Sequence, residues 1–227
     1  MHHDDDNEAA TAPAMTQQPR TLSVDVWFDL VCPWCWIGKH NLARAVERLR
    51  QTDPGLQVQA TWHSVQLIPQ VPPQGWPFDA FYEQRLGSRE AMLARRAQVQ
   101  AAAGLAGAPI DYSRLTVFPN TAAAHRLLAA GKAQLAPAAF DALLTRLFEG
   151  YFTQGENLGD AATLAAIASA HGVDANGPAA HDEPDAQATS HGVPFFVFDR
   201  ALAVSGAQSA DVLWAAMRQA VSATAAR

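Results

Sequence analysis

Residues 26–38 read VWFDLVCPWCWIG, and this stretch decides the fold because two patterns meet in it. Up to its start, apolar residues recur at every second position, which is the period of a β-strand. Beyond it, they recur every three or four positions, as along one face of an α-helix. The strand pattern consists of Leu22, Val24, Val26 and Phe28, and the helix pattern of Gly38, Leu42, Ala45 and Leu49. The stretch therefore predicts a strand followed at once by a helix.

A second strand follows this helix. The turn sequence Asp53-Pro54-Gly55 ends the helical pattern, and alternation then resumes. The alternating apolar residues are Val58, Ala60 and Trp62. A strand, a helix and a strand in this order predict a parallel pair with a right-handed crossover.

The C-terminal end predicts a hairpin and one more helix. Residues 193–198, VPFFVF, form a short apolar strand, Asp199 and Arg200 a turn, and residues 201–205 the partner strand. A helix is expected after Gly206, with the inward residues Ala210, Leu213, Trp214, Met217 and Val221. The two ends of the chain together predict one four-stranded sheet.

The middle of the chain reads as almost wholly helical from about Phe78 to Asp185. Its clearest apolar stripe runs from Phe140 to Tyr151, with Pro137 in the first turn of that helix. We expect the preceding helix to end at Gly131, because glycine is the commonest residue just beyond a helix.

These patterns predict an α/β fold, ordered β-α-β and then β-β-α, with a large all-helical insertion. Residues 1–20 are polar and acidic and are expected to form a disordered tail. Residues 21–77 and 189–227 would form the two parts of the sheet domain, and residues 78–188 the insertion.

The chain holds two cysteines, Cys32 and Cys35, separated by Pro33 and Trp34. At the junction of strand and helix, Cys32 falls at the N-cap and Pro33 at the first helical position, where proline fits well. We expect the Cys32 sulfur to face the N–H groups of Trp34 and Cys35 and the positive end of the helix, which favour the thiolate. Cys35, one turn inward, would resolve a mixed disulfide formed on Cys32.

Other roles for the two cysteines are weaker. A structural disulfide across two intervening residues closes a loop too small to constrain the unfolded chain much. A zinc site would need two more ligands, and the histidines nearest in sequence, His40 and His63, show no ligand spacing. We therefore favour a catalytic redox pair over inert cysteines, and we expect no metal site.

On these residues the sequence resembles the DsbA-like family of thioredoxin-fold proteins, and its FrnE-type branch in particular. Relatives of that branch include 2-hydroxychromene-2-carboxylate isomerases and kappa-class glutathione transferases. The resemblance spans about residues 22–221 and implies a thioredoxin fold with a helical insertion, and disulfide exchange as the activity. It is carried by residues 26–38, Asn120-Thr121 with Ala124-His125-Arg126-Leu127, Leu147-Phe148 with Tyr151-Phe152, residues 192–198 (GVPFFVF) and residues 205–208 (SGAQ).

In the thioredoxin fold, a cis-proline opens the third strand and faces the reactive cysteine. Pro194, preceded by Val193, fits that position, although a proline is tolerated at the start of a strand in any case. We therefore expect a cis Val193–Pro194 bond, with the proline ring against the cysteines. The resemblance implies that Pro33, Trp34, Val193 and Pro194 bind the substrate.

The resemblance leaves three functions to weigh. The isomerase and transferase relatives usually carry serine where Cys32 stands and bind glutathione, whereas this chain has both cysteines. We expect a thiol–disulfide oxidoreductase with no cofactor beyond the Cys32–Cys35 disulfide, and with glutathione as a candidate co-substrate. The alternatives are a glutathione-dependent isomerase or transferase acting on a small aromatic molecule, and a non-catalytic binding module.

The charge and composition of the chain exclude some classes of binding partner. A net charge of −6 argues against nucleic acid, since phosphate binding requires clustered Lys and Arg. No apolar run is long enough for a membrane span, and the N-terminus lacks a secretory pattern. We expect a cytoplasmic monomer or homodimer that acts on protein or small-molecule thiols and disulfides.

Four polar residues near the motif remain. Asp29 could relay protons to the cysteines, but we favour a polar residue at a strand end. For His63, His125 and His191 we favour a structural role over that of a catalytic base.

Overall fold

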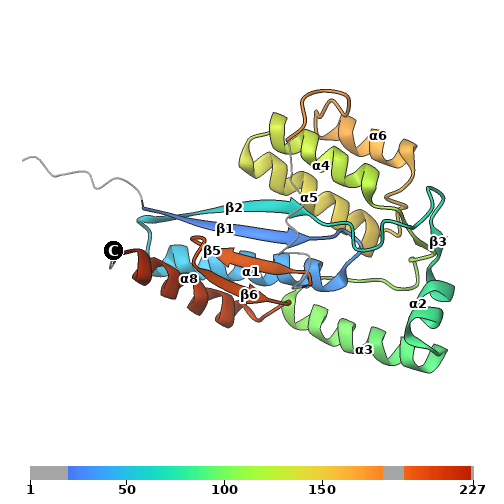
Figure 1. Cartoon of the computed structure of the whole chain (residues 1–227), viewed down its shortest axis with the longest axis horizontal. Coiled ribbons are helices and arrows are strands. Elements are labelled where there is room, and N and C mark those ends of the chain that lie inside the picture. The colour runs from blue at the N-terminus through green and yellow to red at the C-terminus, as the bar shows by residue number, and fades with distance from the viewer. Residues whose placement is uncertain (1–19, 181–191, 226–227) are drawn as a thin grey trace, which may run out of the picture.

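The computed structural model describes residues 20–180 and 192–225, and its centre is a four-stranded sheet (Figure 1). The strands are β1 (Arg20–Phe28), β2 (Leu56–Ser64), β5 (Phe195–Phe198) and β6 (Leu202–Ser205), and their order across the sheet is β2-β1-β5-β6. The β1–β2 pair is parallel, while β5 runs antiparallel to both β1 and β6. This is the predicted β-α-β and β-β-α arrangement.

Two helices cover the sheet on one side. They are α1 (Pro33–Thr52) and α8 (Ala210–Ala225), which pack against each other and lie below β1 and β2 in Figure 1. The alternation that predicted β1 is visible in its burial, since Leu22, Val24 and Val26 are 0% exposed and Ser23 and Asp25 are not buried. The apolar face of the sheet is thus the face that packs into the core.

The insertion contains five helices within the described residues, and they lie above the sheet and to its right in Figure 1. They are α2 (Phe78–Leu86), α3 (Arg89–Ala106), α4 (Ala122–Gln134), α5 (Pro137–Phe152) and α6 (Ala161–Ala170). Two short strands that the sequence did not predict, β3 (Trp76–Pro77) and β4 (Val117–Phe118), pair at its edge. The first residue of β3 is an aromatic residue and the second a proline, so no alternation marks it.

One core joins the insertion to the sheet. The ring of Phe148 on α5 lies 5.9 Å from that of Phe28 on β1 and 5.3 Å from that of Trp36 on α1. Phe148 is 0% exposed, so these contacts are fully desolvated. Aromatic side chains of this size dominate the energetics of a core, and here they hold both parts together.

The expected helix end at Gly131 is wrong. Helix α4 continues through this glycine to Gln134, and Gly131 is buried at the contact between α4 and α5. A Cβ atom at this position would lie 2.5 Å from Cδ2 of Leu143. Glycine is therefore used here for close helix packing and not as a helix terminator.

The predicted fold class is confirmed, and the helices α2 to α6 all fall within residues 78–188. The boundaries of the two domains stay predictions, and the expected tail lies almost wholly outside the described residues. No helix in residues 20–180 and 192–225 is both long and apolar enough to cross a membrane.

Candidate functional site

The two cysteines lie where β1 passes into α1. Cys32 has extended backbone angles and is the N-cap of α1, and Pro33 occupies the first turn, as the sequence predicts. The backbone N–H of Cys32 donates to the carbonyl oxygen of Asp29 at 3.1 Å, which closes the turn between strand and helix. Both cysteines are free thiols.

The environment of the Cys32 sulfur differs from the expected one. Its side chain accepts no capping hydrogen bond, and the N–H of Cys35 donates instead to the carbonyl oxygen of Cys32 at 3.0 Å. The N–H of Trp36 donates to the same oxygen at 3.3 Å. The predicted contact of the sulfur with the N–H of Cys35 is therefore wrong, because the tight first turn uses that donor.

Cys35 is the more deeply buried of the two, with 1% of its surface exposed against 7% for Cys32. Burial raises the pKa of the Cys35 thiol well above its ordinary value, and a hydrogen bond and the charge from Cys32 add to the rise. The backbone of Asp29 donates to Cys35 and partly opposes this. Cys35 is thus held as a thiol at neutral pH.

Val193 and Pro194, which directly precede β5 (Phe195–Phe198), reach the start of α1. The Val193–Pro194 bond is cis, and the Cys32 thiol lies 3.8 Å from the carbonyl oxygen of Val193, to which it donates. Pro194 packs against α1 at Gly38, where a Cβ atom would lie 3.0 Å from Cγ of the proline. Segments 161 residues apart in the chain therefore come together at the Cys32 sulfur.

A buried carboxylate lies beneath the motif. Asp29 is 1% exposed, and its carboxylate accepts the N–H of Leu67 at 2.9 Å and lies 3.0 Å from Nε2 of His125. Nδ1 of His125 is buried and has no hydrogen-bond partner among the residues that the structure describes, which favours the tautomer that carries its proton on Nε2 and donates it to Asp29. The pair thereby fixes the loop that precedes Cys32.

The other two histidines stand apart from this pair. Nε2 of His63 lies 2.8 Å from the carboxylate of Asp25, and both side chains are about one-quarter exposed. The ring of His63 also stacks on that of Trp27, with centroids 4.6 Å apart. His191 lies outside the described residues. Of the three candidate histidines, the structure therefore brings His125 to the strand end next to Cys32.

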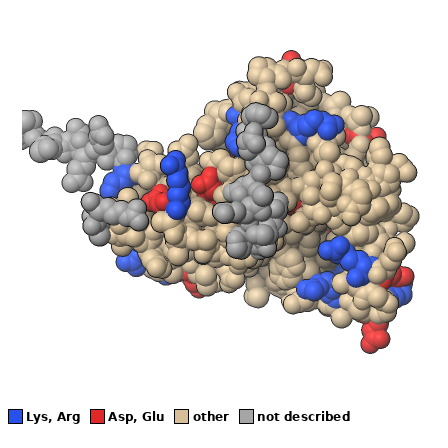
Figure 2. Space-filling model, viewed as in Figure 1, with Lys and Arg blue, Asp and Glu red and all other residues tan. Residues whose placement is uncertain are grey.

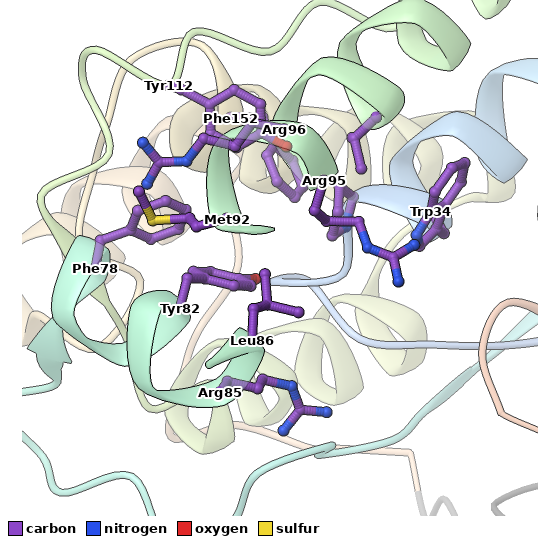
Figure 3. Close-up of a pocket in the computed structure, with 12 residues that line it drawn as sticks. Trp34, Phe78, Tyr82, Arg85, Leu86, Met92, Arg95, Arg96, Tyr112 and Phe152 are labelled. Carbon is purple, nitrogen blue, oxygen red and sulfur yellow. The ribbon is translucent and has the colours of Figure 1, made fainter. Parts of the chain in front are cut away.

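A pocket of about 260 Å³ opens beside Pro33 and Trp34, between α1, α2 and α3 (Figure 3). Sequence reasoning predicted these two as substrate-binding residues, but it missed the helical side of the pocket, notably Tyr82, Arg85 and Arg95. Nothing in their local sequence distinguishes them from other residues of a helix, apart from the adjacent basic residues Arg95 and Arg96. Within the ranges that the structure describes, no cluster of His, Cys, Asp and Glu could hold a metal ion.

Comparisons with known proteins agree with this geometry. Residues 23–218 match the family model described as a DSBA-like thioredoxin domain. A probable DsbA oxidoreductase from Streptomyces coelicolor is 30% identical, with 88% of this chain and 90% of that chain covered and a TM-score of 0.73.

Two further solved structures share the fold. A 2-hydroxychromene-2-carboxylate isomerase is 19% identical over 89% of this chain and 98% of its own, with a TM-score of 0.56. The cytosolic disulfide reductase DsbM from Pseudomonas aeruginosa, solved with glutathione, is 18% identical over 88% and 99%, with a TM-score of 0.55.

Proposed function

Because this chain belongs to the family of DSBA-like thioredoxin domains, we propose that it is a thiol–disulfide oxidoreductase that works through Cys32 and Cys35. The observation that carries the proposal is the inequality of the two thiols. Cys32 caps α1 beside the carbonyl of Val193, while Cys35 is buried directly behind it with a raised pKa. The arrangement is thus suited to attack on a client by Cys32 and to later resolution of the mixed disulfide by Cys35.

The exchange has two steps. The Cys32 thiolate attacks one sulfur of a client disulfide, so that a Cys32–client disulfide forms and the other client sulfur leaves as a thiolate. Cys35 then loses its proton to solvent and attacks the Cys32 sulfur, which releases the second client thiolate. The client gains two electrons, and the protein ends with a Cys32–Cys35 disulfide. The reverse sequence oxidises a dithiol client.

We propose that Pro33, Trp34, Val193 and Pro194 form the surface on which the client lies. The carbonyl oxygen of Val193 supports this role, because it is next to the Cys32 sulfur and just before β5. Glutathione is our candidate for a small thiol partner, because the structurally similar disulfide reductase DsbM was solved with glutathione. No further cofactor is needed, since the electrons pass between sulfur atoms.

The test is to separate the two thiols by mutation. Cys32→Ser should abolish the reduction of insulin disulfides, and Cys35→Ser should accumulate mixed disulfides that gel electrophoresis without reductant resolves. Reduction at the native rate by Cys32→Ser would overturn the proposal. Full turnover by Cys35→Ser with glutathione and a small aromatic substrate would favour the isomerase or transferase alternative, because that chemistry does not need the second thiol.

A further inference from the structure

The pocket beside the motif has an apolar body. It is formed by the first turn of α1, by α2 and α3, by Tyr112 in the loop after α3 and by Phe152 at the end of α5. Figure 3 shows the aromatic rings gathered around its centre. Its volume of about 260 Å³ lies just below the range of about 300–1,000 Å³ that is typical of pockets for drug-sized ligands. A space of this size suits one large side chain. The residues that form the body are Trp34, Phe78, Tyr82, Met92, Tyr112 and Phe152.

The border of the pocket is basic. Arg85 and Arg95 both line it, and neither has an ion pair with any carboxylate in the part of the chain that the structure describes. Two nearby arginines differ, since Arg96 pairs with Asp79 and Arg89 pairs with Glu83. Although the chain has a net charge of −6, Figure 2 shows several basic side chains where Figure 1 has α2 and α3.

The pocket is close to the reactive sulfur. Pro33 and Trp34 belong both to its wall and to the motif, and Figure 3 shows Arg95 extending from α3 toward Trp34. Burial and then the charge of Cys32 raise the pKa of Tyr82, which is consistent with a tyrosine that faces the motif. Burial also raises the pKa of Tyr112 to about 12. Both phenol groups therefore stay protonated and can donate to an anion.

We propose that this pocket binds the aromatic side chain of a disulfide-bearing peptide whose neighbouring residue is acidic. The ring would enter the apolar body, and the carboxylate would lie against Arg85 and Arg95. A client held by a disulfide to Cys32 would be joined to the chain directly before Pro33 and Trp34, which line the pocket. The inference rests on the proposed function and adds to it a class of preferred client.

The step that reports on binding is the first attack. Peptides of the form acetyl-Glu-Phe-Cys-amide, carried as mixed disulfides with 2-thiopyridine, would serve as probes. The Cys32 thiolate attacks the peptide sulfur, forms the Cys32–peptide disulfide and expels pyridine-2-thione, whose absorbance gives the rate. Companion peptides with Gln for Glu, or Ala for Phe, remove the charge or the ring, and a second set with the order Cys-Phe-Glu covers the other chain direction.

We expect the Glu-Phe peptide to react faster than the Gln-Phe peptide by about two- to fivefold for each arginine engaged, which is the effect of a partly exposed ion pair. Arg95→Gln and Arg85→Gln should each reduce the ratio of the Glu-Phe rate to the Gln-Phe rate, and the double variant should bring this ratio to one. Arg89→Gln is the matched control: it removes the same charge from the start of α3, next to Glu83 and outside the pocket, and should leave the ratio unchanged.

The outcomes separate this inference from the proposed function. If the Glu-to-Gln ratio is one in the native protein, or survives the loss of both arginines, the proposal of an acidic client is wrong. If the Phe and Ala peptides react equally, the pocket does not take a peptide side chain. If Cys32→Ser still expels the thione, the redox assignment fails instead, whatever the ratios are.

Discussion

In the proposed exchange, the buried thiol of Cys35 sets how fast a client leaves Cys32. Burial is the largest cause of its raised pKa and persists after Cys32 has formed a mixed disulfide, whereas the hydrogen bond and charge from Cys32 do not. Only the thiolate attacks, and its fraction rises with pH. As long as the pH is below the pKa of Cys35, we therefore expect the rate of client release from Cys32 to rise about tenfold for each unit that the pH is raised. Rapid mixing with an acid quench measures this step, and a rate that does not change between about pH 7 and 9 would contradict it.

The carboxylate of Asp29 offers a second prediction. Asn at this position keeps the shape, but its NH2 group must face either the N–H of Leu67 or Nε2 of His125. In the first case two donors face each other, and in the second His125 has to carry its proton on the buried Nδ1, where no described residue accepts it. Either way a buried polar group loses its partner, so Asp29→Asn should lower the free energy of unfolding by about 1–3 kcal/mol.

Urea denaturation of the reduced protein measures this loss. Asp25→Asn is the control, because Asp25 also pairs with a histidine but is about one-quarter exposed, and it should cost less than about 1 kcal/mol. Equal losses in the two variants would mean that the Asp29–His125 pair contributes no more than a surface contact.

Individual residues of the site were predictable to different degrees. The placement of Cys32, Cys35 and Pro33 at the start of α1 was predictable, because it depends on local order, a strand that passes into a helix. The positions of Arg85 and Arg95 beside Trp34 were not predictable, because they depend on how α2 and α3 fold back on α1. The burial of Asp29 likewise depends on α4, which brings His125 to it across 96 residues of chain.

At the scale of elements, α1 must approach β5 closely for the site to form. Gly38 makes this possible, since a Cβ atom there would lie 3.0 Å from Cγ of Pro194 and 3.2 Å from Cζ of Phe196. Both neighbours are rigid rings, and Phe196 is 0% exposed, so neither can move aside easily. Gly38→Ala should therefore destabilise the protein by about 1–3 kcal/mol and slow disulfide exchange, as α1 is pushed away from Pro194.

A second glycine provides the control for this prediction. Gly104 lies within α3, and a Cβ atom there would meet nothing within 4 Å. Gly104→Ala should stabilise the protein by about 0.5–1 kcal/mol, since alanine has the higher helix propensity. Thermal unfolding of the two variants, together with their insulin reduction rates, checks the pair. If Gly38→Ala were stabilising and had native activity, the contact of α1 with Pro194 and Phe196 would have room for a methyl group.

The elements themselves were largely readable from the sequence. Alternation identified β1, and the apolar stripe of α5 and the hairpin at Asp199 and Arg200 were also found where predicted, both turn residues having positive φ angles. The errors come from packing between elements. Gly131 suggested a helix end because glycine is common just beyond the last turn of a helix. The reason for a glycine inside α4 is the close approach of α5, which cannot be read from the local sequence.

At the scale of the whole molecule, the chain raises the question of whether its two parts unfold together. The sheet and the insertion share one core, in which Phe148 of α5 contacts Phe28 of β1 and Trp36 of α1. The sequence provides separate reporters, because all six tryptophans lie outside residues 78–192 and all three tyrosines lie within them. Tryptophan fluorescence therefore follows mainly the sheet part, while circular dichroism follows helices, most of which belong to the insertion.

We predict one cooperative transition, with coincident curves from the two probes. Phe148→Ala should shift both curves equally and cost about 3–5 kcal/mol, because it removes a fully buried ring from the contact between the parts. Leu105→Ala, at a residue that is 84% exposed on α3, is the control and should stay within about 0.5 kcal/mol of the native protein. If Phe148→Ala moves only the dichroism curve, the insertion folds on its own. The position of the pocket beside Cys32 would then depend on docking between two domains and not on a common core.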